Sequence, residues 1–169
     1  MVQTKYDANL GFLGSTTLDG PSHGDDEGYT MAFDNACNLY VTGYMSASSH
    51  GHDIWLTKFD THLNQLDSMT INGPVNGEDV AYSMFMDDSG RLYHTGVYIE
   101  VNGGANIWIA QFNKNLDLLA SATINGSADG YDTGLGMVKG LSQDFYVTAA
   151  IDETVGGFNI WIGHYQIPD

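Results

Sequence analysis

Three tryptophans are the first candidates for binding chemistry, because they recur at a constant spacing of 53 residues: Trp55, Trp108 and Trp161. A tryptophan face suits the apolar face of a sugar ring, and nearby Asn and Asp side chains accept hydrogen bonds from its hydroxyl groups. The alternative is core packing, which the isoleucine before each tryptophan favours. A carbohydrate-binding protein more often carries its aromatic side chains in loops. The loop candidates are Tyr44, Tyr98, Tyr131 and Phe158.

Three aspartates share this spacing, and they are the candidates for a metal site: Asp26, Asp79 and Asp132. Carboxylate oxygens are hard ligands that suit Ca²⁺. The simpler interpretation is that each aspartate caps a turn by accepting hydrogen bonds from backbone N–H groups. Asp25 and Glu78 place a second carboxylate before this aspartate in two copies, but the third copy has Tyr131 at that position, which weakens the case for a symmetric cation site. Ca²⁺ therefore remains the functional alternative to turn capping.

Motifs for catalysis or for tight metal binding are missing from the sequence. His50 and His52 form at most a weak metal pair, and zinc needs three or four converging ligands. The single Cys37 has no neighbouring base to activate it. There is no Gly-x-Ser-x-Gly sequence and no phosphate-binding loop. We therefore predict that the protein is not an enzyme.

The constant spacing extends over the whole chain, so the elements that position these residues form an internal repeat. A tyrosine, a threonine and an aspartate each recur three times, and so does the Ile-Trp pair. Within one copy, Leu39–Ser46 is rich in aromatic and β-branched residues, as strands are. Ile54–Phe59 has a period of two, with Ile, Leu and Lys on one face and Trp, Thr and Phe on the other. Turn residues separate the strands. Each copy accommodates four short strands, which is typical of a β-propeller blade.

A family resemblance is carried by residues 24–44 (GDDEGYTMAFDNACNLYVTGY) and 53–60 (DIWLTKFD). This stretch resembles the SBBP-type bacterial β-propeller repeat, and the resemblance covers essentially the whole chain. It implies a module of an exported or cell-surface bacterial protein. It implies no catalytic residues. We therefore expect an all-β propeller protein at or outside a bacterial cell surface.

The repeats provide material for three blades, which is too few for a closed ring, since propellers typically have four to eight. The predicted strand order is third and fourth, then two full sets of four, then first, second and third. The last blade lacks its fourth strand, and Leu10–Gly20 is a spare copy of it. The predicted segments are 1–20 (a third and fourth strand), 21–73 (first blade), 74–126 (second blade) and 127–169 (third blade).

Two copies of the chain provide the simplest way to complete the ring. If each Leu10–Gly20 strand completes the other chain's last blade, a six-bladed homodimer results. Residues 1–7 are then surplus, because 160–166 already occupy their place. We predict a self-assembling scaffold or binding module. The alternatives are a carbohydrate-binding lectin with one site per blade, and an engineered or duplicated propeller fragment with no ligand of its own.

The charge of the chain limits its partners. Five Lys and Arg stand against 21 Asp and Glu, for a net charge of −16. A nucleic-acid partner is excluded because it needs a basic surface, and docking on anionic lipid is disfavoured for the same reason. No apolar run reaches about 18 residues, so membrane insertion is not expected. No signal peptide is seen; an exported protein would have lost it already. A glycan or a protein remains as the ligand.

Overall fold

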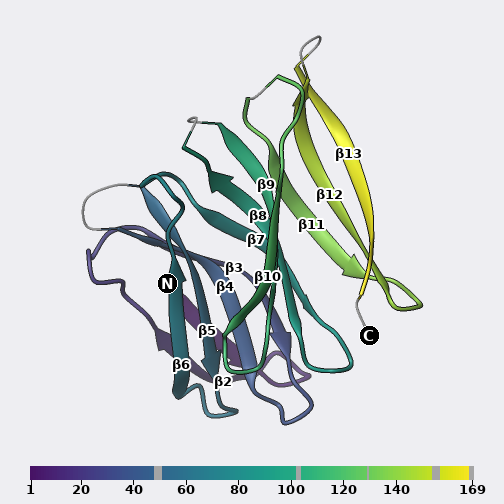
Figure 1. Ribbon diagram of the computed structural model, residues 1–169. Coiled ribbons are helices and arrows are strands. Elements are labelled where there is room, and N and C mark those ends of the chain that lie inside the picture. The colour runs from purple at the N-terminus through teal and green to yellow at the C-terminus, as the bar shows by residue number, and fades with distance from the viewer. Residues whose placement is uncertain (48–50, 102–103, 129, 154–156, 168–169) are drawn as a thin grey trace.

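The structure is a computed structural model, and it describes residues 1–47, 51–101, 104–128, 130–153 and 157–167 (Figure 1). It confirms an all-β chain with thirteen strands. These are arranged as two four-stranded antiparallel sheets, a three-stranded sheet and a two-stranded hairpin.

The sheets follow the chain in order. The N-terminal hairpin consists of β1 (Val2–Tyr6) and β2 (Phe12–Thr17). The first sheet consists of β3 (Asp26–Phe33), β4 (Leu39–Ser46), β5 (His52–Phe59) and β6 (Gln65–Ile71). The second sheet consists of β7 (Val80–Met86), β8 (Leu92–Ile99), β9 (Ala105–Phe112) and β10 (Leu118–Ile124). The third sheet consists of β11 (Thr133–Lys139), β12 (Asp144–Glu153) and β13 (Gly157–Gln166). In the described part of the chain, no strand pairs with the outer side of β13.

Local backbone features recur at the same 53-residue spacing as the sequence. The first strand of each sheet has a register shift at one equivalent residue, so the extra residues are Tyr29, Tyr82 and Leu135. The hairpins between third and fourth strands each hold one leucine at positive φ: Leu10, Leu63 and Leu116. The copies are therefore equivalent in conformation as well as in sequence.

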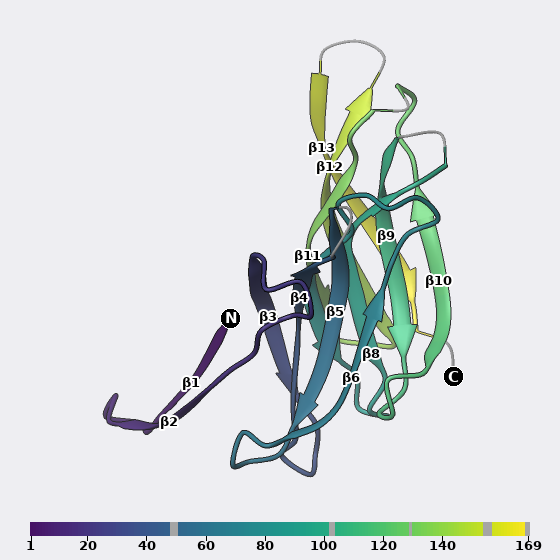
Figure 2. The same ribbon diagram turned by 90° about the vertical axis from the view of Figure 1, so that its left-hand side faces the viewer.

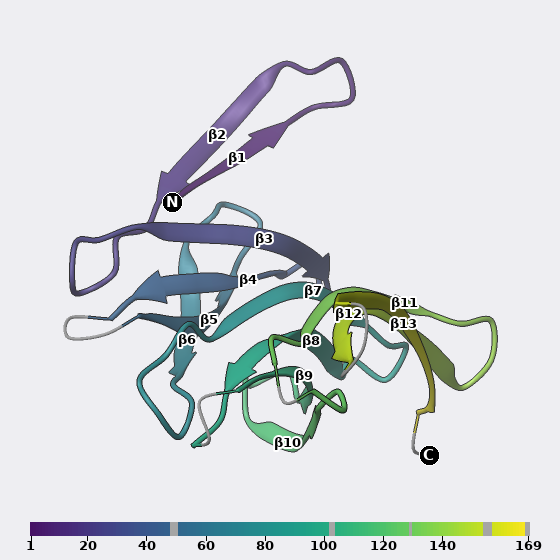
Figure 3. The ribbon, with the colours of Figure 1, turned by 90° about the horizontal axis from the view of Figure 1, so that it is seen from above.

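The three sheets are stacked face to face, and apolar cores lie between them. Each sheet has a front face toward the preceding element of the chain and a back face toward the following one. The first core joins the back face of the first sheet, with Ile54 and Leu56, to the front face of the second, with Trp108 and Phe112. The second core repeats this arrangement between the second and third sheets. The first strands β3, β7 and β11 lie side by side along the inner margin of the stack (Figure 3).

The stack is an open arc rather than a closed ring. In two views at right angles to Figure 1, the N-terminal hairpin projects at one end and the third sheet lies at the other (Figures 2 and 3). The back face of the third sheet and the outer edge of β13 therefore meet no other part of the described chain. At the two ends of the arc, apolar side chains are exposed that no further sheet of the described chain covers.

Candidate functional site

The back face of the third sheet is the largest departure from the repeat. Ile160 is 88% exposed and Ile162 is 66% exposed, and Tyr146 and Val138 on the same face are also exposed. Their counterparts in the first and second sheets are buried in the cores: Tyr40, Ile54, Leu56, Tyr93, Ile107 and Ile109. The same residue positions are thus core in two copies and surface in the third. We define the third sheet's back face and the outer edge of β13 as the candidate functional site.

The opposite end of the arc is covered by the N-terminal hairpin. Trp55 and Phe59 on the front face of the first sheet pack beneath Met1 and Leu18 of this hairpin. The hairpin thereby occupies the place that the back face of a preceding sheet takes at the other interfaces. The outer side of the hairpin exposes apolar residues, among them Val2 and Phe12. Both ends of the stack therefore present apolar surface to solvent.

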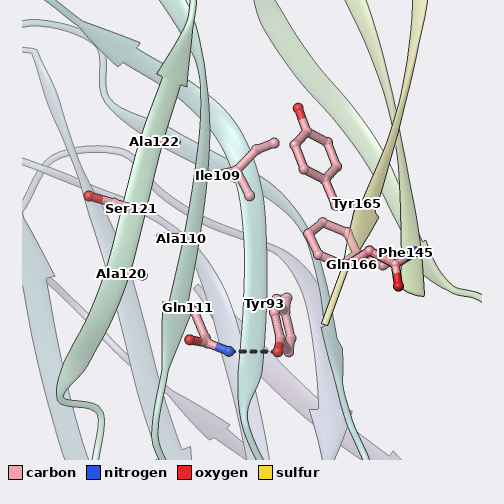
Figure 4. A pocket seen from close by; sticks show the side chains of 10 residues that line it. All are labelled: Tyr93, Ile109, Ala110, Gln111, Ala120, Ser121, Ala122, Phe145, Tyr165 and Gln166. Carbon is pink, nitrogen blue, oxygen red and sulfur yellow. Dashed lines mark hydrogen bonds between the residues drawn. The ribbon is translucent and has the colours of Figure 1, made fainter. Parts of the chain in front are cut away.

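A pocket of roughly 200 Å³ lies between the second and third sheets, next to the free edge of β13 (Figure 4). Tyr165 and Phe145 form one wall, and Ile109 and Ala122 form another. The Nε2 of Gln111 donates a hydrogen bond of 2.6 Å to the Tyr93 hydroxyl at one end of the pocket. The remaining wall is largely apolar. Sequence reasoning missed this pocket, although Ala122 stands where the first sheet has the larger Met69.

The three repeated aspartates each bind backbone rather than one another. Asp79 accepts hydrogen bonds from the N–H of Gly73 (2.6 Å) and the N–H of Ile99 (2.8 Å). Asp26 and Asp132 make the two equivalent bonds in their own copies. Each carboxylate thus ties the end of a preceding fourth strand to the end of its own second strand. Asp79 and Asp132 are fully buried, and burial raises the pKa of Asp79 above its ordinary value.

Both oxygens of each aspartate are used in this way, which is the arrangement expected for turn capping. Within the described residues, no group of three or more His, Cys, Asp and Glu side chains is close enough to hold a metal ion. His50, one half of the histidine pair in the sequence, lies outside the described residues. His52 stacks on Tyr44 with a ring separation of 3.9 Å and pairs with Glu78. The structure thus uses these residues for local packing and pairing.

The tryptophans lie in or against the cores between sheets. Trp55 and Trp108 are buried, and Trp161 is half-buried against the second core. Trp108 also stacks on Tyr98 with ring centroids 5.9 Å apart. These rings are occupied by protein contacts, so their flat faces are not displayed as platforms. The structure does not bring the three tryptophans together.

The prediction that the candidate aromatic residues lie in loops is wrong for Tyr44, Tyr98 and Phe158, which lie in β4, β8 and β13. Tyr131 precedes β11, remains exposed and lines a second hollow. Tyr131 lies beside Tyr82 and Phe158 in a shallow apolar pocket near the inner margin of the stack. Tyr44 is buried, and it packs against Tyr29 at 6.0 Å. This pocket belongs to the third sheet, and its outer wall is one of the two open ends. An equivalent exposed set is not repeated at Tyr44 or Tyr98, which are both packed.

A further polar residue that the sequence did not single out is buried in the core. His94 stands where the other two copies have Val41 and Val147. Its ring is fully buried and meets Phe112 edge-on at 5.0 Å. Within the described residues neither ring nitrogen has a hydrogen-bond partner. Burial lowers the pKa of His94 to about 3, so the neutral ring is the folded form at neutral pH.

Comparison with models of known protein families and with curated protein sequences found no match. The resemblance to the SBBP-type repeat therefore stays a prediction that rests on the quoted residues. In the described part of the chain, no helix is long and apolar enough to cross a membrane. The function must accordingly be argued from the geometry of the two open ends.

Proposed function

We propose that the protein is a non-enzymatic, self-assembling β-propeller module whose ring is completed by a second copy of the same chain. The observation that carries the proposal is the back face of the third sheet. Ile160 and Ile162 are exposed there, while the same positions are buried in both preceding sheets. A second copy supplies the missing cover, because the front face of its first sheet is built to receive such a back face. Six sheets in one ring fall within the range of known propellers.

The energy available is of the right size for such a dimer. Burying an isoleucine or tyrosine side chain is worth about 1.5–3 kcal/mol. Ile160, Ile162 and Tyr146 at two equivalent interfaces therefore supply on the order of 10 kcal/mol. The loss of overall motion on association costs about 4–15 kcal/mol. Pairing at the free edge of β13 also removes an edge that would otherwise pair nonspecifically.

The test is the mass of the protein in solution, measured by light scattering over a dilution series. We expect the mass of two chains at tens of micromolar and dissociation on dilution. The double variant Ile160→Asp/Ile162→Asp should remain a single chain. Val101→Asp, which changes an exposed apolar residue away from both ends, should dimerise normally. A single-chain mass for the unmodified protein at every concentration would refute the proposal.

A lectin is the second candidate, and the pocket beside Tyr131 favours it. Exposed aromatic side chains of Tyr131 and Phe158 offer a platform of the kind that sugars bind. Glycan-array binding that is lost in Tyr131→Ala but retained in Leu141→Ala would support this function, since Leu141 is exposed elsewhere. If no glycan binds, the lectin is refuted and the self-assembling scaffold is the remaining proposal.

We propose a location at or outside a bacterial cell surface, which the resemblance to exported repeat proteins supports.

A further inference from the structure

The N-terminal hairpin reproduces the outer half of a complete sheet. Val2 pairs with Thr17 as Trp55 pairs with Thr70, 53 residues further on. The register shift after Lys5 recurs after Lys58. β1 is therefore bound to β2 as a third strand is bound to a fourth. It occupies the place that β13 of a second copy takes in the proposed ring.

β1 is a poorer match for this place than β13. Gln3 stands where the three complete copies have Leu56, Ile109 and Ile162. Its side chain is nevertheless buried against the first sheet, and its amide donates to the sulfur of Met1 at 3.2 Å, which is a weak acceptor. Replacing β1 by β13 exchanges this buried amide for an isoleucine. The exchange also covers an isoleucine that is 66% exposed in the free chain.

Phe12 connects the hairpin with the pocket between the second and third sheets. In the free chain Phe12 pairs with Tyr6 across the hairpin, and the rings meet edge-on with centroids 5.9 Å apart. Tyr165 is the counterpart of Tyr6, and it lines the pocket. If β2 pairs with β13 in the register that it now keeps with β1, Phe12 lies opposite Tyr165. Directly opposed residues of antiparallel strands share one face, so the Phe12 ring then points to the pocket.

The pocket has the size and chemistry for this ring. In the first core, Met69 packs at the position equivalent to Ala122, and the residue opposite Phe112 is Leu118. In the second core the smaller Ala122 leaves space, and in the proposed pairing the larger Phe12 lies opposite Tyr165. The volume lost from Met69 to Ala122 is thus offset by the volume gained from Leu118 to Phe12. Figure 4 shows the residues that line the pocket, with Tyr165 and Phe145 on the side of the third sheet and Ala120 and Ala122 on the outer strand of the second sheet.

We propose that β1 is a placeholder, which is displaced when β13 of a second copy pairs with β2, and that Phe12 of that β2 then fills the pocket of the partner. This inference rests on the proposed function and deepens it, because it names the strand that must leave and the side chain that anchors. Assembly is consequently a strand exchange with an internal competitor. The occupant of the pocket is a second copy of this chain.

A reversible lock on the hairpin tests the exchange in the full chain. Val2→Cys and Thr17→Cys are introduced together with Cys37→Ser, which removes the native cysteine. Directly paired antiparallel residues have Cα separations of about 4.5–5.5 Å, which a disulfide spans. Peptide mapping confirms that the bridge is within one chain. The same protein is then measured by light scattering in its reduced and oxidised forms.

We expect the reduced form to dimerise and the oxidised form to remain a single chain. Equal dimerisation of both forms would overturn the placeholder, while the proposed assembly would stand. A single-chain mass for both forms and for the unmodified protein would overturn the assembly and the placeholder together. The failure of the inference and the failure of the proposed function therefore give different results.

Phe12→Ala tests the anchor separately. Phe12 is 62% exposed in the free chain, so the melting temperature of the dilute, single-chain protein should be nearly unchanged. Each dimer holds two such anchors, so the dissociation constant should rise on the order of a hundredfold or more. Val101→Ala is the control and should change neither quantity. Ala122→Met fills the pocket from within and should also weaken the dimer, without lowering the melting temperature of the single chain. An unchanged dissociation constant in both Phe12→Ala and Ala122→Met would overturn this anchor.

Discussion

The buried histidine of the first core predicts a sharp dependence of stability on pH. His94 is fully buried without a partner for either ring nitrogen in the described part of the chain. Its pKa in the folded protein is about 3, against about 6.5 when the chain is unfolded. Between these values the unfolded chain binds a proton that the folded chain does not. The free energy of unfolding therefore falls as the pH drops below about 6.5, and it is unaffected by His94 above that pH.

The size of the effect follows from the two pKa values. Linkage gives a loss of about 2 kcal/mol between pH 7.5 and pH 5, and about 4 kcal/mol by pH 3. Carboxylates with lowered folded pKa values, such as Asp34 and Asp60, lose their contribution only as the pH falls below about 4. His23 and Asp79, whose pKa values are raised, also contribute to the pH dependence near this interval. The contribution of His94 is therefore the difference in pH dependence between the unmodified protein and a variant that lacks this ring. A loss of about 2 kcal/mol is a large part of the stability of an ordinary domain.

The perturbation is His94→Val, which places at this position the residue found in the other two copies. At pH 7.5 the variant should be more stable by about 1–2 kcal/mol, because two unsatisfied polar atoms are removed from the core. Between pH 7.5 and pH 5 it should lose about 2 kcal/mol less than the unmodified protein. Urea unfolding at fixed protein concentration, repeated at each pH, measures both quantities.

His94→Asn is the matched control, since asparagine retains a buried polar group but does not titrate. It should remove the pH dependence without the stabilisation at pH 7.5. If the free energy of unfolding depends on pH equally in the unmodified protein and in His94→Val, the His94 ring binds its proton as well in the folded chain as in the unfolded chain. Burial would then not lower the pKa of His94, and the prediction would be refuted.

Three further predictions concern charge, turn capping and the hairpin backbone. Because dimerisation brings together two chains of net charge −16, the dissociation constant should fall as salt rises, which sedimentation at several ionic strengths measures. Asp79→Ala should lower the free energy of unfolding, measured in urea, by about 2–4 kcal/mol. The loss should be larger than for Asp26→Ala, because Asp79 is the more buried, and equal losses would contradict this. Cys37 has a φ of 62° where the second copy has Gly90, so Cys37→Gly should raise the stability by up to about 1 kcal/mol, and a lower melting temperature would contradict it.

The repeat made the sheets predictable, because strand boundaries follow from alternation and turns that recur three times. The second strand was expected at Leu39–Ser46 and is found there. The first strand begins at Asp26, because the bulge at Tyr29 lets pairing with the second strand continue past it. A bulge residue leaves little trace in the sequence pattern, so this boundary was less predictable.

The candidate site was less predictable, because its definition depends on which copies lack a neighbour. Ile160 and Ile107 have nearly identical local sequences, and only the missing cover distinguishes them. The pocket arises from Ala122, Tyr165 and the absent fourth strand together, and no single motif encodes it. The burial of Trp55 and Trp108, by contrast, agrees with the isoleucine that precedes each one. Symmetry predicts packing well, and departures from symmetry need the structure.

The two ends of the arc differ in a way that explains why β1 is retained. The front face of the first sheet, with Trp55 and Phe59, would be a large apolar surface if it were bare. β1 covers it with a strand that carries Gln3 and Lys5 where β13 has Ile162 and His164. In the proposed assembly, a cover that matched as well as β13 would compete too strongly for the dimer to form. A strand of intermediate fit would protect the free chain from nonspecific pairing and would still give way to the correct partner, as the proposed homodimer requires.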